Sequence, residues 1–161
     1  MNANNFVKIQ GIKGACTIEG FEGCIEVDTV NYSAQQPTSV SRGSGGGGTT
    51  SQAYHGDVLC TKTTDDSTPI IAKNLWLGKT LPSVAVTMCK MDGAKRIPYL
   101  TIDLKDVVVS SFQLSSGGSM AQERLSFNYG TIKLNYHAQS PEGSAEGNIP
   151  AQTSLITGKV N

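Results

Sequence analysis

The chain contains Tyr99-Leu-Thr-Ile-Asp-Leu-Lys-Asp-Val-Val-Val-Ser-Ser111 and, after a Gly/Ser-rich loop, Leu125-Ser-Phe-Asn-Tyr-Gly-Thr-Ile-Lys-Leu-Asn-Tyr-His137. In the first segment, apolar residues alternate strictly with polar ones between Leu100 and Lys105. Because successive side chains of a strand point to opposite faces, a period of two gives one apolar and one polar face. The two segments therefore predict a β-sheet protein with one wet face. The phase of the second segment shifts at Gly130, which predicts a bulge there.

The rest of the chain predicts more strands and a single helix. Strands are expected over 6–10, 24–32, 55–62 and 83–89, with a bulge near Thr29 in the second of them. A helix is expected over about 68–77, because possible capping residues and Pro69 precede it and Gly78 follows it. The segment 139–152 is expected to be flexible and to precede a possible last strand. This pattern predicts one mainly β domain over 1–161, folded as a barrel or as two packed antiparallel sheets with a helix alongside.

Composition limits the partners of the chain. It has 161 residues, with 13 basic and 13 acidic side chains, so the formal net charge is zero. Nothing in this balance attracts nucleic acid or an anionic membrane, and near-zero charge permits close self-association. No apolar run approaches the about 20 residues of a membrane helix, and residues 1–6 lack the features of a secretory signal. We therefore expect a protein that starts in the cytoplasm and is not processed at its N-terminus.

The four cysteines predict no metal site. They stand at positions 16, 24, 60 and 89, and none forms a Cys-x-x-Cys pair. We expect four reduced thiols that serve as small apolar or turn residues. The sequence leaves open whether Cys16 and Cys24 pair in an oxidising compartment.

Three other motifs resemble catalytic or ligand-binding motifs only in part. Residues 43–48 satisfy Gly-x-Gly-x-x-Gly, but no helix pattern follows, as a dinucleotide site requires. Gly78-Lys79-Thr80 imitates the end of a phosphate loop without its first glycine. His55 and Asp57 share a strand face, but they are better explained as surface residues than as metal ligands. The sequence thus predicts no catalytic residue, cofactor or metal.

Two segments are instead predicted to contact other subunits. The Gly-rich extended loop over 33–52 is long for a compact domain, and glycine lets a backbone approach another surface closely. The run Val107-Val108-Val109 makes both faces of its strand apolar, which indicates either a buried strand or contact with a neighbour. The expected residues of an interface with other subunits are Gly43, Ser44, Gly45, Gly46, Gly47, Gly48, Val107, Val108 and Val109.

Several segments in the same order resemble the Hcp (haemolysin-coregulated protein) family of type VI secretion systems. The resemblance lies in the Tyr-Leu-x-Ile-x-Leu motif at 99–104 with its Val-Ser-Ser continuation, and in the segments at 6–14, 25–28, 57–62 and 66–69. It implies a structural protein that forms stacked hexameric rings inside a contractile sheath, topped by a VgrG spike above a baseplate. It also implies expulsion into target cells without a cleaved signal, and small effectors carried in the lumen.

Two alternative functions stay open from the sequence. One is a small β-barrel ligand-binding module or enzyme that uses the Gly-rich loop as a lid. The other is a phage tail tube protein, whose fold resembles that of Hcp. A tube subunit needs a heterologous, ring-closing interface, whereas a lidded enzyme does not.

Overall fold

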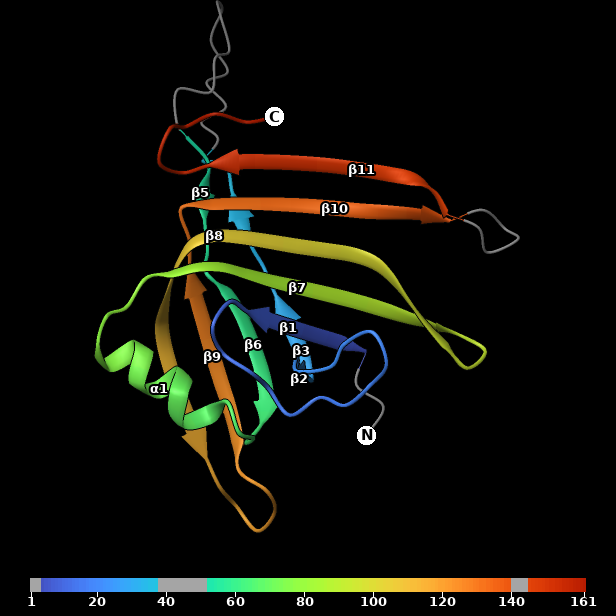
Figure 1. The fold of residues 1–161 in the computed structure, drawn as a ribbon. Helices are drawn as coiled ribbons and strands as arrows, with labels where there is room; N and C mark the ends of the chain where they lie inside the picture. The colour runs from blue at the N-terminus through green and yellow to red at the C-terminus, as the bar shows by residue number, and fades with distance from the viewer. Residues whose placement is uncertain (1–3, 38–51, 140–144) are drawn as a thin grey trace, which may run out of the picture.

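The computed structural model describes residues 4–37, 52–139 and 145–161 of the chain. These residues form eleven strands and one helix, which confirms the predicted mainly β fold although the strands are more numerous than the sequence pattern indicates (Figure 1). The elements are β1 (Asn5–Ile9), β2 (Ile25–Val27), β3 (Thr29–Asn31), β4 (Ala34–Gln35), β5 (Tyr54–His55), β6 (Val58–Thr63), α1 (Thr68–Trp76), β7 (Leu81–Asp92), β8 (Lys95–Ser115), β9 (Gln122–Asn128), β10 (Thr131–Gln139) and β11 (Ala145–Ser154).

Two packed antiparallel sheets share the long strand β8. Its first half pairs with β7 and β10, and its second half pairs with β9. The first sheet adds β1, β2 and β11, and the second adds β6 and β3. β8 changes direction at Asp106, whose φ of 53° is the only positive value at a non-glycine residue in the described part of the chain. The register also shifts between Val109 and Ser111, so one strand turns from one sheet into the other.

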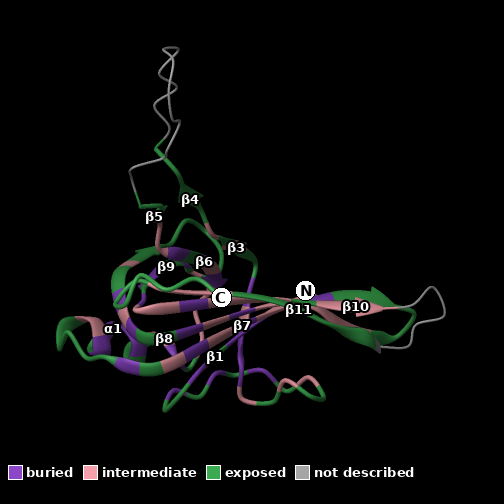
Figure 2. Ribbon diagram, turned by 90° about the horizontal axis from the view of Figure 1, so that it is seen from above, coloured by how far each residue is buried: buried purple, intermediate pink, exposed green. Residues whose placement is uncertain are grey.

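The core lies between the two sheets and follows the predicted alternation. Ile102 and Leu104 of the first segment and Leu125 and Phe127 of the second are all at most 2% exposed. Figure 2 shows buried segments gathered where the strands of the two sheets come together, while the far ends of β10 and β11 are exposed or half-buried. The helix α1 closes one side by packing against β8, and Ile71 is fully buried there.

The helix ends as its sequence predicts. Gly78 has a φ of 58°, and its N–H donates to the carbonyl of Leu75. The N–H of Lys79 donates to the carbonyl of Asn74, which completes a Schellman motif. A residue without a Cβ is favoured at that left-handed position, so the helix stops after Trp76.

At both positions where the sequence predicts a bulge, near Thr29 and at Gly130, the structure has a break between two strands instead. Asp28 separates β2 from β3, and its N–H donates to the carbonyl of Thr61 at 2.7 Å. Gly130 separates β9 from β10 and donates to the carbonyls of Lys105 and Asp106. A Cβ at Gly130 would lie 2.8 Å from Ile156 Cδ1, so the end of the exposed Ile156 side chain packs over this glycine.

The last strand begins earlier than the sequence predicts. β11 covers 145–154, which includes most of the segment expected to be flexible before a strand after Gln152. Gly147 and Pro150 are unfavourable in a strand, so the sequence does not predict one over these residues. However, β11 is an outer strand that pairs with β10 alone among the strands, and the missing N–H of Pro150 is tolerated there. Asn161 then exchanges backbone hydrogen bonds with Gln152, which ties the C-terminus to this strand.

Candidate assembly surface

The structure divides the residues predicted to form an interface. Residues 43–48 lie outside the described part of the chain. Val107 and Val109 are 0% and 3% exposed, so their side chains belong to the core of the subunit and do not reach a neighbour. Val108 points to the opposite face and is half-buried. Within this run, contact with another subunit therefore depends on Val108 alone.

A polar cluster holds the base of the extended loop. β4 and β5, which lie on the two sides of the loop base, pair with each other. The Tyr32 hydroxyl lies 3.0 Å from His55 Nδ1. Tyr129 donates from its hydroxyl to the carbonyl of Gly56 at 2.7 Å. Burial raises the pKa of both tyrosines, so they stay neutral and keep their hydroxyl protons. The cluster fixes where the Gly-rich segment leaves the sheets, and the sequence analysis missed it because its members are far apart in the chain.

An apolar patch surrounds this loop base. It consists of Tyr54, Leu155, Ile156 and Val160, which are 69%, 43%, 70% and 78% exposed. Figure 1 shows the C-terminal tail next to β5 at the end of the subunit where the loop departs. Leu155 and Val160 line one hollow together with His55 of β5. Exposed apolar side chains that gather on one surface mark interaction sites in soluble proteins.

A second exposed apolar patch lies on α1. We define the helix patch as Ile70, Trp76 and Leu77, which are 42%, 78% and 66% exposed, together with the exposed lysines Lys73 and Lys79. The opposite side of α1 carries the buried Ile71, Ala72 and Asn74. The sequence pattern alone did not separate these two sides, because the helix is apolar on both.

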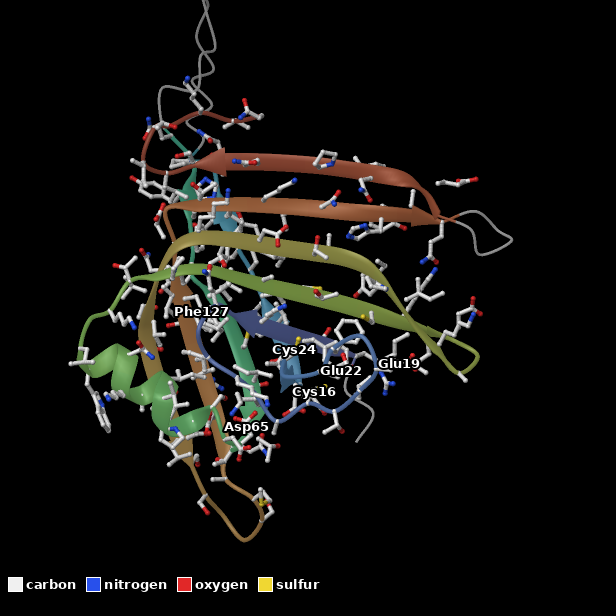
Figure 3. All side chains as sticks on the ribbon, viewed as in Figure 1. Cys16, Glu19, Glu22, Cys24, Asp65 and Phe127 are labelled. Atoms are coloured by element: carbon white, nitrogen blue, oxygen red, sulfur yellow. The ribbon has the colours of Figure 1, made fainter. Side chains whose placement is uncertain are left out.

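A buried ion cluster joins the start of α1 to the second sheet. Lys62 Nζ lies 2.9 Å from Glu123 Oε2 and 2.9 Å from Asp65 Oδ1, and both Lys62 and Glu123 have fully buried side chains. Thr68 donates to Glu123 and lies 3.3 Å from Lys62 Nζ. Asp65 lies at the end of β6 (Figure 3) and belongs to this cluster. The sequence alone identifies it only as a residue before the helix.

We expect Asp65 to make folding sensitive to acid. Burial alone would raise the pKa of this carboxyl, but hydrogen bonds from Ser67 and Lys62 and the charge of Lys62 outweigh burial and hold the pKa below its ordinary 3.8. A lowered folded-state pKa contributes stability above 3.8 that is lost as the pH falls through the lower folded value. Asp65→Asn should therefore flatten the acid limb of a plot of unfolding free energy against pH, measured by urea denaturation. An unchanged acid limb would contradict this assignment.

Candidate metal ligands do not cluster in the described residues, and the four thiols are unpaired. They contain no group of three or more metal-ligating side chains. His55 contacts Tyr32, whereas Asp57 accepts hydrogen bonds from Ser110 and Asn128, so the two side chains that the sequence places on one strand face have different partners. All four cysteines are free and buried, and burial raises the pKa of Cys60 to about 12. The helix in this part of the chain has nine residues, and no helix there has the length and hydropathy of a membrane span.

The sequence of the chain matches a family model and a known protein. The family model described as "Type VI secretion system effector, Hcp" matches residues 6–136. Protein hcp1 of Pseudomonas aeruginosa is 35% identical over 95 residues, which cover 56% of this chain and 57% of that protein. The match thus spans little more than half of this curated relative.

Solved structures match over a longer range. One, described as the structure of a type six secretion system protein, superimposes with a TM-score of 0.90 at 28% identity and covers 99% of both chains. Hcp1 from Salmonella typhimurium gives a TM-score of 0.80 at 22% identity over 100% of both chains, a likeness of fold. Since the family model spans most of the sequence and the fold agrees throughout, the chain belongs to the Hcp family of type VI secretion proteins.

Proposed function

We propose that the chain is a structural subunit of the inner tube of a type VI secretion system and that it assembles into stacked hexameric rings. The observation that carries this proposal is the agreement of fold with a type six secretion system protein across 99% of both chains. The Hcp family consists of secreted structural proteins rather than enzymes. The proposal extends this family property to a specific assembly of this chain.

Two features of the subunit support self-assembly. Exposed apolar patches lie at the loop base and on α1, and the net charge is zero, so copies do not repel one another. β11 also has one edge that is free along most of its length among the described residues. Unpaired strand edges favour pairing with another chain.

The proposal includes specific contacts and partners. Within it, the Gly-rich segment 43–48 and Val108 contact neighbouring subunits, and the segment acts between stacked rings. The tube meets a VgrG-type spike, a contractile sheath and a baseplate, and its lumen carries small effector proteins. The chain stays in the cytoplasm until the sheath contracts.

We expect native mass spectrometry of the purified protein at micromolar concentration to give a species of six times the 17.0 kDa subunit mass. Deleting Ser44–Gly48 should leave this ring intact and abolish end-to-end stacking in negative-stain micrographs, because only the inter-ring contact is removed. A wild-type protein that is entirely monomeric or dimeric would overturn the ring. A deletion that unfolds the subunit would overturn the role of the segment.

We also expect secretion to depend on the sheath. The folded protein should accumulate in the medium of the parent strain and be absent from the medium of a sheath-deleted strain. Its N-terminus in the medium should lie at or next to Met1, because Phe6–Ile9 forms most of β1 and processing beyond it would remove a strand from the first sheet. A cytosolic marker controls for lysis, and equal amounts in both media would contradict the proposal.

A further inference from the structure

The helix patch carries charge that the described subunit does not neutralise. Lys73 and Lys79 are both exposed, and neither forms a salt bridge with a described carboxylate. Between them lie Trp76 and Leu77, two-thirds or more exposed. Buried tryptophans surrounded by polar groups dominate protein interfaces, and a solvent-exposed tryptophan beside two free lysines is suited to an acidic surface with an apolar centre.

A surface of that chemistry exists on another part of the same subunit. We define the acidic loop as residues 15–23, which connect β1 to β2. Glu19 and Glu22 are exposed on this loop, and Ile18 and Phe21 beside them are half-buried. The ring of Phe21 stacks on Phe6 with centroids 4.0 Å apart, and the Gly20 N–H donates to Glu22 Oε2 at 3.0 Å. These contacts give the loop a defined shape, on which two carboxylates are exposed beside half-buried apolar side chains. The stem of Lys13 packs near Gly23, so a lysine borders the end of the loop that carries Glu22.

The two surfaces lie on different sides of the subunit. In Figure 1, α1 is at the left edge of the molecule, and in the same view in Figure 3 Glu19 and Glu22 lie beyond β6 on the other side. The helix patch and the acidic loop can therefore contact each other only when they belong to two different copies of the chain, arranged head to tail. A heterologous contact of this kind repeats from copy to copy and generates a closed ring or a helical filament.

We propose that the helix patch of one subunit binds the acidic loop of the next subunit, with Lys73 and Lys79 facing Glu19 and Glu22 and with Trp76 against the apolar centre of the loop. The proposal rests on the ring assembly proposed above, and it names the two surfaces that form the ring contact. Complementary charge then sets the head-to-tail orientation, and the apolar centre supplies the contact area.

Charge reversal tests the pairing. Lys73→Glu with Lys79→Glu, or Glu19→Lys with Glu22→Lys, should raise the concentration at which rings dissociate by about tenfold or more, because each places like charges opposite one another. Combining all four substitutions should restore assembly, since the opposite charges face each other again. Lys95→Glu, at the exposed tip of the β7–β8 hairpin, is the matched control and should leave assembly unchanged. Failure of the fourfold variant to recover while each double variant is impaired would contradict the pairing.

Intrinsic fluorescence provides an independent test, because Trp76 is the only tryptophan of the chain. Its emission should shift to shorter wavelength, and its quenching by acrylamide should fall, when subunits diluted to monomers are concentrated into rings. Rings whose Trp76 stays fully quenchable would overturn this proposal alone and would assign the helix patch to a partner outside the ring. A wild-type chain that stays monomeric at every concentration would contradict the ring assembly itself.

Discussion

Lys62→Met is expected to destabilise the fold by about 3–5 kcal/mol, the cost of leaving a buried charge without its partner. The side chains of Lys62 and Glu123 are both fully buried and their charged atoms are 2.9 Å apart, so the substitution strands the Glu123 carboxylate between α1 and β9. Urea denaturation followed by circular dichroism, at one fixed protein concentration, measures this loss. A loss below about 1 kcal/mol, the range of an exposed ion pair, would show that the cluster is not buried in solution.

The geometry of the cluster also predicts an asymmetry between its members. Glu123→Leu should cost less than Lys62→Met, because Lys62 keeps Asp65 as a partner at 2.9 Å whereas Glu123 has no second cation among the described residues. The double variant Lys62→Met/Glu123→Leu should recover most of the loss, since two apolar side chains then replace two buried charges. A double variant that is as unstable as the sum of the two single variants would contradict the pairing.

Gly14→Ala is expected to destabilise the fold by about 3 kcal/mol or more, through overpacking against backbone. A Cβ at this position would lie 2.2 Å from the carbonyl oxygen of Cys24 and 2.6 Å from its carbonyl carbon. Gly14 also donates to the carbonyl of Gly23 at 2.8 Å, so the loop that precedes β2 cannot move away without losing this bond. Thermal unfolding should show a correspondingly lower midpoint for the variant.

Gly117→Ala is the matched control for this substitution. Gly117 also has no positive φ, and a Cβ there meets no atom within 4 Å. We expect its thermal midpoint to equal that of the wild type within error. Equal midpoints for all three proteins would show that the Gly14 contact is looser than the structure has it.

Local sequence was sufficient for most of the elements of this protein. The alternation from Leu100 to Lys105 predicts β8 because a strand with one buried face must repeat every two residues. The helix was predicted over 68–77 and runs over 68–76, because Pro69 and Gly78 act through backbone conformation within one turn. Such signals depend only on residues that are close together in the chain, so they predict a strand or a helix without knowledge of the fold.

The same local signals predicted the last strand only after Gln152, later than β11 begins, and they left the role of the valine run undecided. Gly147 and Pro150 are unfavourable for a strand, and only the pairing of β11 with β10, at the outer edge of the sheet, makes the strand stable. Val107, Val108 and Val109 are alike in sequence, but the turn of β8 between two sheets buries the first and third and leaves the second half-exposed. Burial depends on which elements face each other, and that is a property of the whole fold.

The sequence by itself determined the fold class, the single helix and the membership of a family with a characteristic order of segments. Only the tertiary structure decided which surfaces are available for assembly. Lys62 and Glu123 are 61 residues apart and form one buried ion pair, whereas Trp76 ends an apolar helix and is exposed. The physical reason is that hydrophobic periodicity specifies a local face, while charge pairing and exposure depend on contacts between segments distant in the chain.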